Sequence, residues 1–193
     1  MPAAPHPAGP AGDLKWLDRA LQRMRIRRAA PFIGREDAVL DIGCADGSLF
    51  TRLPWIREGV GIDPDPGVSA RVGITLRRGQ FPDALAPDER FDVLTALAVL
   101  EHVPAEGQRA FAKGCRQALR PGGRLVLTVP APLVDRLLDV LIALRVLRGM
   151  EAEEHWGFSP ATTVALFSRE GFRLETHRRF ELGLNHLFVF RAP

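Results

Sequence analysis

Residues 39–48, VLDIGCADGS, constrain the fold more than any other stretch of the chain, because a dense apolar run ends in an acid and two closely spaced glycines. Apolar runs of this kind are typical of parallel strands that are buried on both faces. Gly43 and Gly47 permit a tight turn and a close approach of the backbone to a ligand. Loops of this kind hold nucleotide-like ligands in doubly wound sheets. The stretch therefore predicts a strand, a ligand-binding loop and a helix, in that order.

Short apolar runs alternate with helical stretches along the rest of the chain. This alternation predicts an open parallel sheet with helices on both faces. Helices are expected at 48–53, 106–119 and 159–171, the last with Ser159 as its N-cap, Pro160 in its first turn and Gly171 at its end. Strands are expected at 38–43, 59–63, 73–79, 91–100, 124–130, 173–182 and 185–191, and the short connection between the last two indicates an antiparallel hairpin.

Two further helices lie outside this alternation. Residues 1–12 are rich in Pro, Ala and Gly and are expected to form a disordered leader, whereas 13–30 form a basic helix with an apolar stripe. The basic face is either solvated or a surface for an anionic substrate, a membrane or a nucleic acid. Residues 131–149 form an apolar helical insertion, which is a packed helix, a lid over a substrate pocket or a dimer surface.

The residues around the glycines indicate which nucleotide is bound. A dinucleotide fingerprint that began at Gly43 would need glycine where Ala45 and Ser48 stand, so a diphosphate is poorly supported. Asp41 stands before the loop and favours a cationic ligand. Asp63 lies 22 residues further on, at a strand end where a carboxylate can accept from both ribose hydroxyls. A ribose, a cationic end and no phosphate together suggest S-adenosylmethionine.

Composition excludes several broad classes of protein. The chain has 193 residues, which fits one domain, and its formal net charge of +3 is too small to indicate nucleic acid by itself. No apolar run reaches the roughly 18 residues of a membrane span. Two cysteines cannot form a disulfide framework, and the N-terminus lacks a secretory signal, so we expect a cytoplasmic protein that is a monomer or a homodimer.

Four segments in order resemble the class I S-adenosylmethionine-dependent methyltransferases. They are VLDIGCADG, GIDPDP, FDVLTALAVLEHVP and LRPGGRLVLTVP, and they fall within residues 38–130. The resemblance implies a single Rossmann-like domain over 13–193, with a seven-stranded sheet of order 3-2-1-4-5-7-6 and one antiparallel strand. It also implies methyl transfer to an oxygen, nitrogen or carbon of a small metabolite, for which the apolar helix 133–147 favours a hydrophobic acceptor.

The resemblance implies a role for each matching position. Asp41 orients the amino end of the cofactor, and Asp63 holds the ribose hydroxyls. Ala45 replaces a central glycine, a mild change if its φ stays negative, and Gln80 stands where the family often has Asp. The remaining cofactor contacts are expected from the backbone of Gly43, Cys44, Ala45 and Gly47, from Pro64, Gln80 and Phe81 beside the adenine, and from Ala96 and Leu97 near the sulfonium.

The sequence does not assign a catalytic residue, because methyl transfer from a sulfonium depends mainly on positioning. Glu101 and His102 resemble a segment of ubiquinone-pathway O-methyltransferases, but Ala98 stands where their metal-supported pattern has Glu, so no metal is expected. His155 and Trp156 suit the rim of a substrate pocket, although a surface histidine is the alternative. The rival functions are a nonenzymatic binding or scaffold protein with the cofactor fold and an NAD-dependent oxidoreductase.

Overall fold

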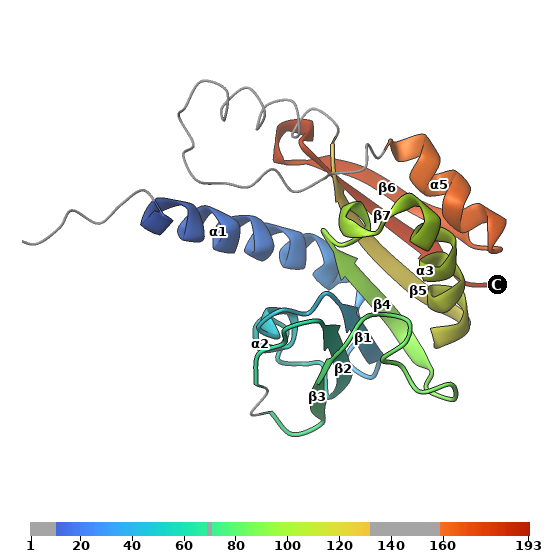
Figure 1. Ribbon diagram of the computed structural model, residues 1–193, viewed down its shortest axis with the longest axis horizontal. Coiled ribbons are helices and arrows are strands. Elements are labelled where there is room, and N and C mark those ends of the chain that lie inside the picture. Colours follow the sequence, from blue (N-terminus) through green and yellow to red (C-terminus); the bar gives the residue numbers. More distant parts are fainter. Residues whose placement is uncertain (1–10, 69–70, 132–158) are drawn as a thin grey trace, which may run out of the picture.

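The computed structural model describes residues 11–68, 71–131 and 159–193, with side chains from residue 18 onward, and it contains one seven-stranded sheet (Figure 1). The strand order is β3-β2-β1-β4-β5-β7-β6, and β7 runs antiparallel to both of its neighbours, which confirms the expected fold. The strands are β1 (Ala38–Ile42), β2 (Glu58–Asp63), β3 (Ile74–Arg78), β4 (Phe91–Leu97), β5 (Leu119–Pro130), β6 (Arg173–Phe180) and β7 (Asn185–Arg191).

Helices cover both faces of this sheet. One face packs against α3 (Ala105–Ala118) and α5 (Pro160–Arg169), and the other packs against α1 (Ala11–Ala29) and α2 (Ser48–Arg52). Alternate residues of β1 pack on opposite faces of the sheet: Leu40 belongs to the hydrophobic cluster around Phe111, and Val39 belongs to the cluster around Ile26. Short 3-10 turns at Ala30–Phe32, Leu100–His102 and Glu181–Gly183 complete the described elements.

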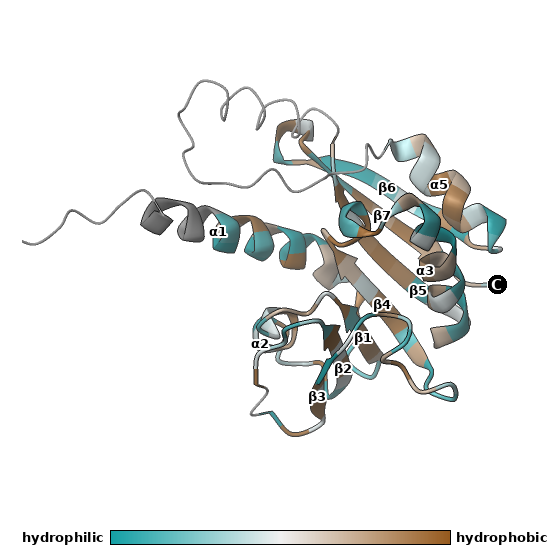
Figure 2. Ribbon diagram, in the orientation of Figure 1, coloured by the Kyte–Doolittle hydropathy of each residue, from teal (hydrophilic) through white to brown (hydrophobic). Residues whose placement is uncertain are grey.

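Figure 2 shows hydrophobic residues along the central strands and hydrophilic ones along the edge strand β6. Of the helices that the structure describes, none combines the length and the apolar character needed to cross a membrane.

Several predicted boundaries are wrong: the strand expected over 91–100 ends at Leu97, the strand expected over 173–182 ends at Phe180, and the starts of α1 and β5 also differ. Residues 11 and 12, which are expected in the leader, belong to α1. The spacing of apolar residues, on which the predicted boundary rests, does not locate the first turn of a helix. The strand expected at 124 begins at Leu119, directly after α3. Leu119 pairs with Phe91 and Arg124 pairs with Val93, so the Pro-Gly-Gly segment bulges out of the ladder instead of lying before it.

The two ends of α5 match the capping residues that the sequence predicts. The Ser159 hydroxyl accepts from the amide of Thr162 at 3.2 Å, and the Thr162 hydroxyl accepts from the amide of Ser159 at 3.1 Å, so α5 starts with a capping box. Gly171 ends the helix with a φ of 86°. The expected insertion lies outside the described residues from 132 onward, and so do His155 and Trp156.

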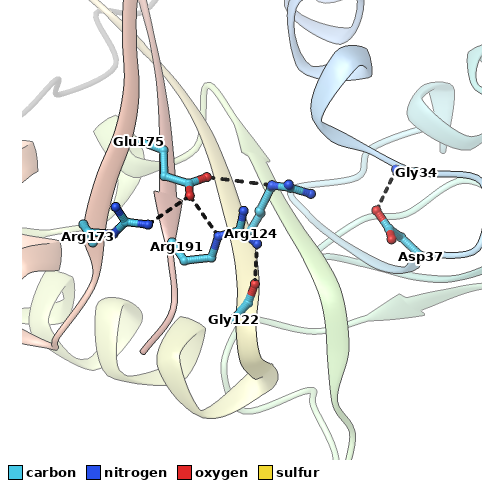
Figure 3. A network of polar contacts seen from close by, with 7 residues as sticks. All are labelled: Gly34, Asp37, Gly122, Arg124, Arg173, Glu175 and Arg191. Atoms are coloured by element: carbon cyan, nitrogen blue, oxygen red, sulfur yellow. Dashed lines mark hydrogen bonds and ion pairs between the residues drawn. The ribbon is translucent and has the colours of Figure 1, made fainter.

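A polar network joins the last three strands at the end of the sheet where β5 starts (Figure 3). The Glu175 carboxylate of β6 lies 2.9 Å from Arg191 of β7, 3.4 Å from Arg173 and 3.8 Å from Arg124 of β5. Arg191 also donates to the carbonyl of Gly122 at 2.7 Å. Single exposed ion pairs contribute little, so this network mainly keeps the strand ends aligned while apolar packing holds the hairpin.

The packing of the hairpin generates a first prediction. Phe188 and Phe190 are fully buried, and the Phe190 ring lies 5.1 Å from that of Phe167 in α5. We expect Phe188→Ala to lower the free energy of unfolding by about 3–5 kcal/mol, because it leaves a cavity at the centre of this cluster. Urea unfolding followed by circular dichroism measures the change. Val72→Ala, at a side chain that is 96% exposed, should change stability by less than about 0.5 kcal/mol.

Candidate functional site

A cavity of about 730 Å³ lies at the carboxyl edge of the parallel strands. Its wall is formed by residues 42–43 after β1, 62–64 at the end of β2, 79–83 after β3 and 98–99 after β4, and by 102–104, 107 and 110–111 on the side of α3. Open α/β sheets bind ligands at this edge, where the strand order reverses between β1 and β4. The volume falls within the range of small-molecule sites.

The glycine loop after β1 folds back on β2. The amides of Gly43 and Cys44 both donate to the carbonyl of Ile62, at 2.8 and 3.3 Å, and the amide of Gly47 donates to the carbonyl of Cys44 at 2.8 Å. Gly43 and Gly47 both have a φ of 72°, and a Cβ at Gly43 would lie 2.5 Å from Val99. These three amides are therefore already hydrogen-bonded within the protein and are not free to donate to another group.

Ala45 departs from the expected backbone. Its φ is 44°, in the left-handed region. The replacement of glycine by alanine would be mild only at a negative φ, so it is not mild here. The amide of Ala45 donates to one carboxylate oxygen of Asp63 at 3.0 Å, and the amide of Asp65 donates to the other at 2.8 Å. The carboxylate of Asp63 therefore holds Ala45 in its strained conformation, and it also lies on the wall of the cavity.

Asp41 is buried and does not lie on the cavity wall. The residue is 5% exposed, and its carboxyl group accepts from the hydroxyl of Thr95 at 2.6 Å. Burial raises the pKa of Asp41 to about 7; the Thr95 hydrogen bond opposes this change, and the negative charges of Asp63 and Asp46 add to it. The structure therefore places Asp41 beneath the cavity, as a carboxyl group whose pKa burial has raised toward neutral pH.

The loop after β3 brings Gln80 and Phe81 to the cavity. The amide of Gly79 donates to the carbonyl of Asp63 at 2.9 Å, which ties the start of this loop to the end of β2. The ring of Phe81 packs edge-on against Phe111 of α3, with 5.3 Å between ring centroids. A Cβ at Gly114 would lie 3.1 Å from the Phe81 ring, so a glycine in α3 makes room for it.

The segment after β4 contributes residues beyond those expected. Ala96 is fully buried in the strand, and the cavity is lined by Ala98 and Val99 instead of Ala96 and Leu97. Ala98 has a φ of 61°, and its amide donates to the carbonyl of Thr128 at 3.0 Å. This left-handed residue turns the chain out of the sheet, and no local sequence signal marks it.

Five of the predicted cofactor residues line the cavity together: Gly43, Asp63, Pro64, Gln80 and Phe81. Six do not line it: Asp41, Cys44, Ala45, Gly47, Ala96 and Leu97. Cys44 is buried beneath the loop, and burial raises the pKa of its thiol to about 12, so it is not a nucleophile at neutral pH.

The wall formed by α3 is not among the site residues predicted from the sequence. Gly107, Ala110 and Phe111 line the cavity at helical spacing, and that spacing was the signal that could have revealed them. Asp83, which directly follows the loop residues that were predicted, was also missed. His102 lies on the same wall.

The cavity wall has a distinct charge character. It carries the carboxylates of Asp63 and Asp83, and none of its described residues is a lysine or an arginine. Such a wall disfavours a diphosphate and suits a ligand that is neutral or cationic. Across the described residues, no three His, Cys, Asp or Glu side chains are grouped so that they could hold a metal ion.

Comparisons with known proteins agree with this geometry. A family model described as "Methyltransferase domain" matches residues 14–179. A ubiquinone biosynthesis O-methyltransferase from Bradyrhizobium sp. (strain ORS 278) is 36% identical over 101 residues, covering 47% of this chain and 38% of the relative. Another, from Azorhizobium caulinodans, is 32% identical over 152 residues, covering 70% of this chain and 58% of the relative. The chain therefore spans between 38% and 58% of the length of these relatives.

Two solved structures share the fold. An S-adenosylmethionine-dependent methyltransferase from Mesorhizobium loti has a TM-score of 0.68 at 20% identity, over 91% of this chain and 100% of the other. A 1,6-didemethyltoxoflavin-N1-methyltransferase from Burkholderia thailandensis, solved with 1,6-didemethyltoxoflavin and S-adenosylhomocysteine, has a TM-score of 0.70 at 17% identity. This match covers 99% of this chain and 93% of the other. At such identities the likeness establishes the fold alone.

The strain at Ala45 generates a second prediction. We expect Ala45→Gly to raise the free energy of unfolding by about 0.5–1 kcal/mol, because glycine adopts a positive φ without the steric cost that alanine carries. Thermal unfolding measures the change. Ala86→Gly, at an exposed loop position without a positive φ, should have the opposite sign. A destabilised Ala45→Gly variant would contradict the strain assigned to this loop.

Asp41 generates a third prediction. Its pKa in the folded protein, about 7, exceeds the unfolded value, so the folded state binds more protons between about pH 4 and 7. The contribution of Asp41 to stability is therefore present at low pH and is lost as pH rises through 7, by at most about 1.4 kcal/mol per pH unit. Asp41→Asn keeps an acceptor for Thr95 but should lose this dependence. Urea unfolding at pH 5, 6, 7 and 8 compares the two proteins, and parallel curves would refute the assignment.

Proposed function

Because this chain belongs to the class I S-adenosylmethionine-dependent methyltransferases, we propose that it binds S-adenosylmethionine in the cavity at the carboxyl edge and transfers the methyl group to a small molecule. The observation that supports this most strongly is the Asp63 carboxylate on a wall without described lysine or arginine. A carboxylate at the end of the second strand can accept from two ribose hydroxyls, and the absence of cations suits a ligand with a sulfonium and no phosphate.

The residues on the cavity wall fit S-adenosylmethionine in size and chemistry. Both oxygens of Asp63 already accept one backbone amide each, which fixes the carboxylate, and each oxygen keeps a further lone pair for a hydroxyl. Phe81 and Pro64 offer flat apolar surfaces for an adenine, and the Gln80 amide oxygen can accept from its amine. Gly43 lets Val99 pack against the backbone of the loop, since a Cβ at this position would clash with Val99 at 2.5 Å.

In this proposal the protein acts mainly by positioning. When bound, the cofactor supplies a methyl group that is already activated, so no metal and no covalent intermediate with the protein are needed. The apolar side chains of Val99, Val103 and Phe111 exclude water from the same cavity. For a hydroxyl acceptor, His102 offers an imidazole on this wall that can accept the departing proton.

We further propose an oxygen atom of a small, hydrophobic molecule as the acceptor. The support is that curated relatives are ubiquinone biosynthesis O-methyltransferases, and that the chain carries the apolar stretch 133–147. His155 and Trp156, which lie outside the described residues, stay predictions for the substrate side. A cytoplasmic location is part of the same proposal.

Asp63 provides the sharpest test of cofactor binding. Asp63→Asn keeps one oxygen for the amide of Ala45 but loses the charge that strengthens hydrogen bonds to ribose, so we expect S-adenosylhomocysteine to bind about 10–100-fold more weakly. Isothermal titration calorimetry measures the affinity. Asp65→Asn is the matched control, because that side chain is 85% exposed and pairs with Arg78. Unchanged affinity in Asp63→Asn, or tighter binding of NAD than of S-adenosylhomocysteine, would refute the cofactor assignment.

Turnover is tested separately from binding. The full chain is incubated with methyl-labelled S-adenosylmethionine and a panel of small hydrophobic phenols and catechols, and mass spectrometry follows the label. Label on an acceptor oxygen supports the proposal. Binding of S-adenosylhomocysteine without transfer to any acceptor in the panel would favour a nonenzymatic protein that keeps the cofactor fold.

A further inference from the structure

A stripe of arginines runs along one side of α1. Arg19, Arg23 and Arg27 are spaced four residues apart, so they share one side of the helix, and all three are exposed. Arg52, at the end of α2, is exposed beside them. Within the described part of the chain, no ion pair neutralises these four side chains. We call these four residues the arginine stripe.

An apolar groove runs beside the arginine stripe, between α1 and α2. Its volume is about 770 Å³, and Arg23, Arg27 and Arg52 form part of its lining. Between the arginines it exposes Met24, at 39%, and the half-buried indole of Trp55. No carboxylate belongs to the described lining of this groove. The groove therefore pairs positive charge with exposed apolar surface.

The Trp55 ring is held in place in the groove. Its indole nitrogen donates to the carbonyl of Ile33 at 3.3 Å, so the polar end of the ring is satisfied within the protein and the apolar part is presented. A fixed aromatic ring beside arginines is the composition found where proteins meet the interfacial region of a bilayer.

The groove lies next to the ligand-binding edge of the sheet. Gln22 of α1 donates to Asp46 of the glycine loop at 3.5 Å, so the helix lies against that loop. Figure 1 shows the amino-terminal half of α1, the long blue helix, extending past the body of the domain. A surface in contact with the arginine stripe would therefore lie close to the cavity proposed for the cofactor.

We propose that the arginine stripe and the groove beside it dock the protein onto an anionic lipid bilayer. The arginines meet lipid phosphates, and Met24 and Trp55 enter the boundary between headgroups and acyl chains. A nucleic acid would neutralise the arginines but leave the aliphatic part of the groove in water, whereas a bilayer satisfies both. Only the consequence of docking rests on the proposed function: it would place the cavity where hydrophobic acceptors concentrate.

The test is vesicle flotation of the full chain without cofactor. We expect binding to vesicles of phosphatidylcholine with about 30% phosphatidylglycerol, little binding to phosphatidylcholine alone, and release at about 0.5 M salt. The triple variant Arg23→Glu/Arg27→Glu/Arg52→Glu should bind anionic vesicles at least about 100-fold more weakly. The control Lys113→Glu/Arg116→Glu/Arg169→Glu changes the net charge equally on α3 and α5, at the other face of the sheet, and should retain binding.

Circular dichroism and thermal unfolding check that each variant is folded. If the Glu variant is not folded, the Arg→Gln variant at the same three positions replaces it. Equal loss of vesicle binding in the stripe and control variants would overturn the proposal, because net charge alone would then explain the binding. So would equal binding to neutral vesicles, no binding to anionic vesicles, or preferential binding of duplex DNA or polyglutamate over vesicles. A chain that docks on vesicles but does not bind S-adenosylhomocysteine would overturn the proposed function and leave the docking in place.

Discussion

The hydrogen bonds of Asp63 hold together the edge of the sheet where the cavity lies. The carboxylate accepts from the amide of Ala45 in the glycine loop and from the amide of Asp65 in its own turn, while the carbonyl of the same residue accepts from Gly79 at the start of the next loop. Three connections that are distant in sequence are thus fixed by one residue. Because these three hydrogen bonds all lie within the protein, they hold this part of the cavity wall together.

Unfavourable features are concentrated at the same edge. Ala45 and Ala98 both hold left-handed backbone conformations, and Asp41 is a buried carboxyl group whose pKa is raised to about 7. Such features persist only where the surrounding structure imposes them. Here the two well-packed clusters on the faces of the sheet impose them, since their side chains fix the strand ends from which these residues emerge. The strained backbone at this edge of the sheet therefore depends on the packing of the two layers.

The two faces of the sheet also divide the surface chemistry. The face of α3 supplies the apolar wall of the cavity through Phe111, whereas the face of α1 presents exposed arginines and the groove that contains Trp55. Both reach the same edge, because α1 contacts the glycine loop through Gln22 and Asp46. This arrangement gives one domain two chemically different surfaces at the place where its proposed reaction occurs.

The sequence by itself determined the strands, the glycine loop, the acid at the end of β2 and the cap of α5, because each has a signal within about ten residues, whereas the expected strand order followed from the resemblance to a known family. Apolar runs, Gly43 and Gly47, Asp63, and the Ser159–Pro160 pair are local features whose consequences are local. Only the tertiary structure decided the positive φ of Ala45, the burial of Asp41, the turn at Ala98 and the contribution of α3 to the cavity. These depend on which segments meet across the fold, and the neighbours along the chain show neither that Ala45 and Ala98 adopt a positive φ nor that the carboxyl group of Asp41 lies beneath the cavity.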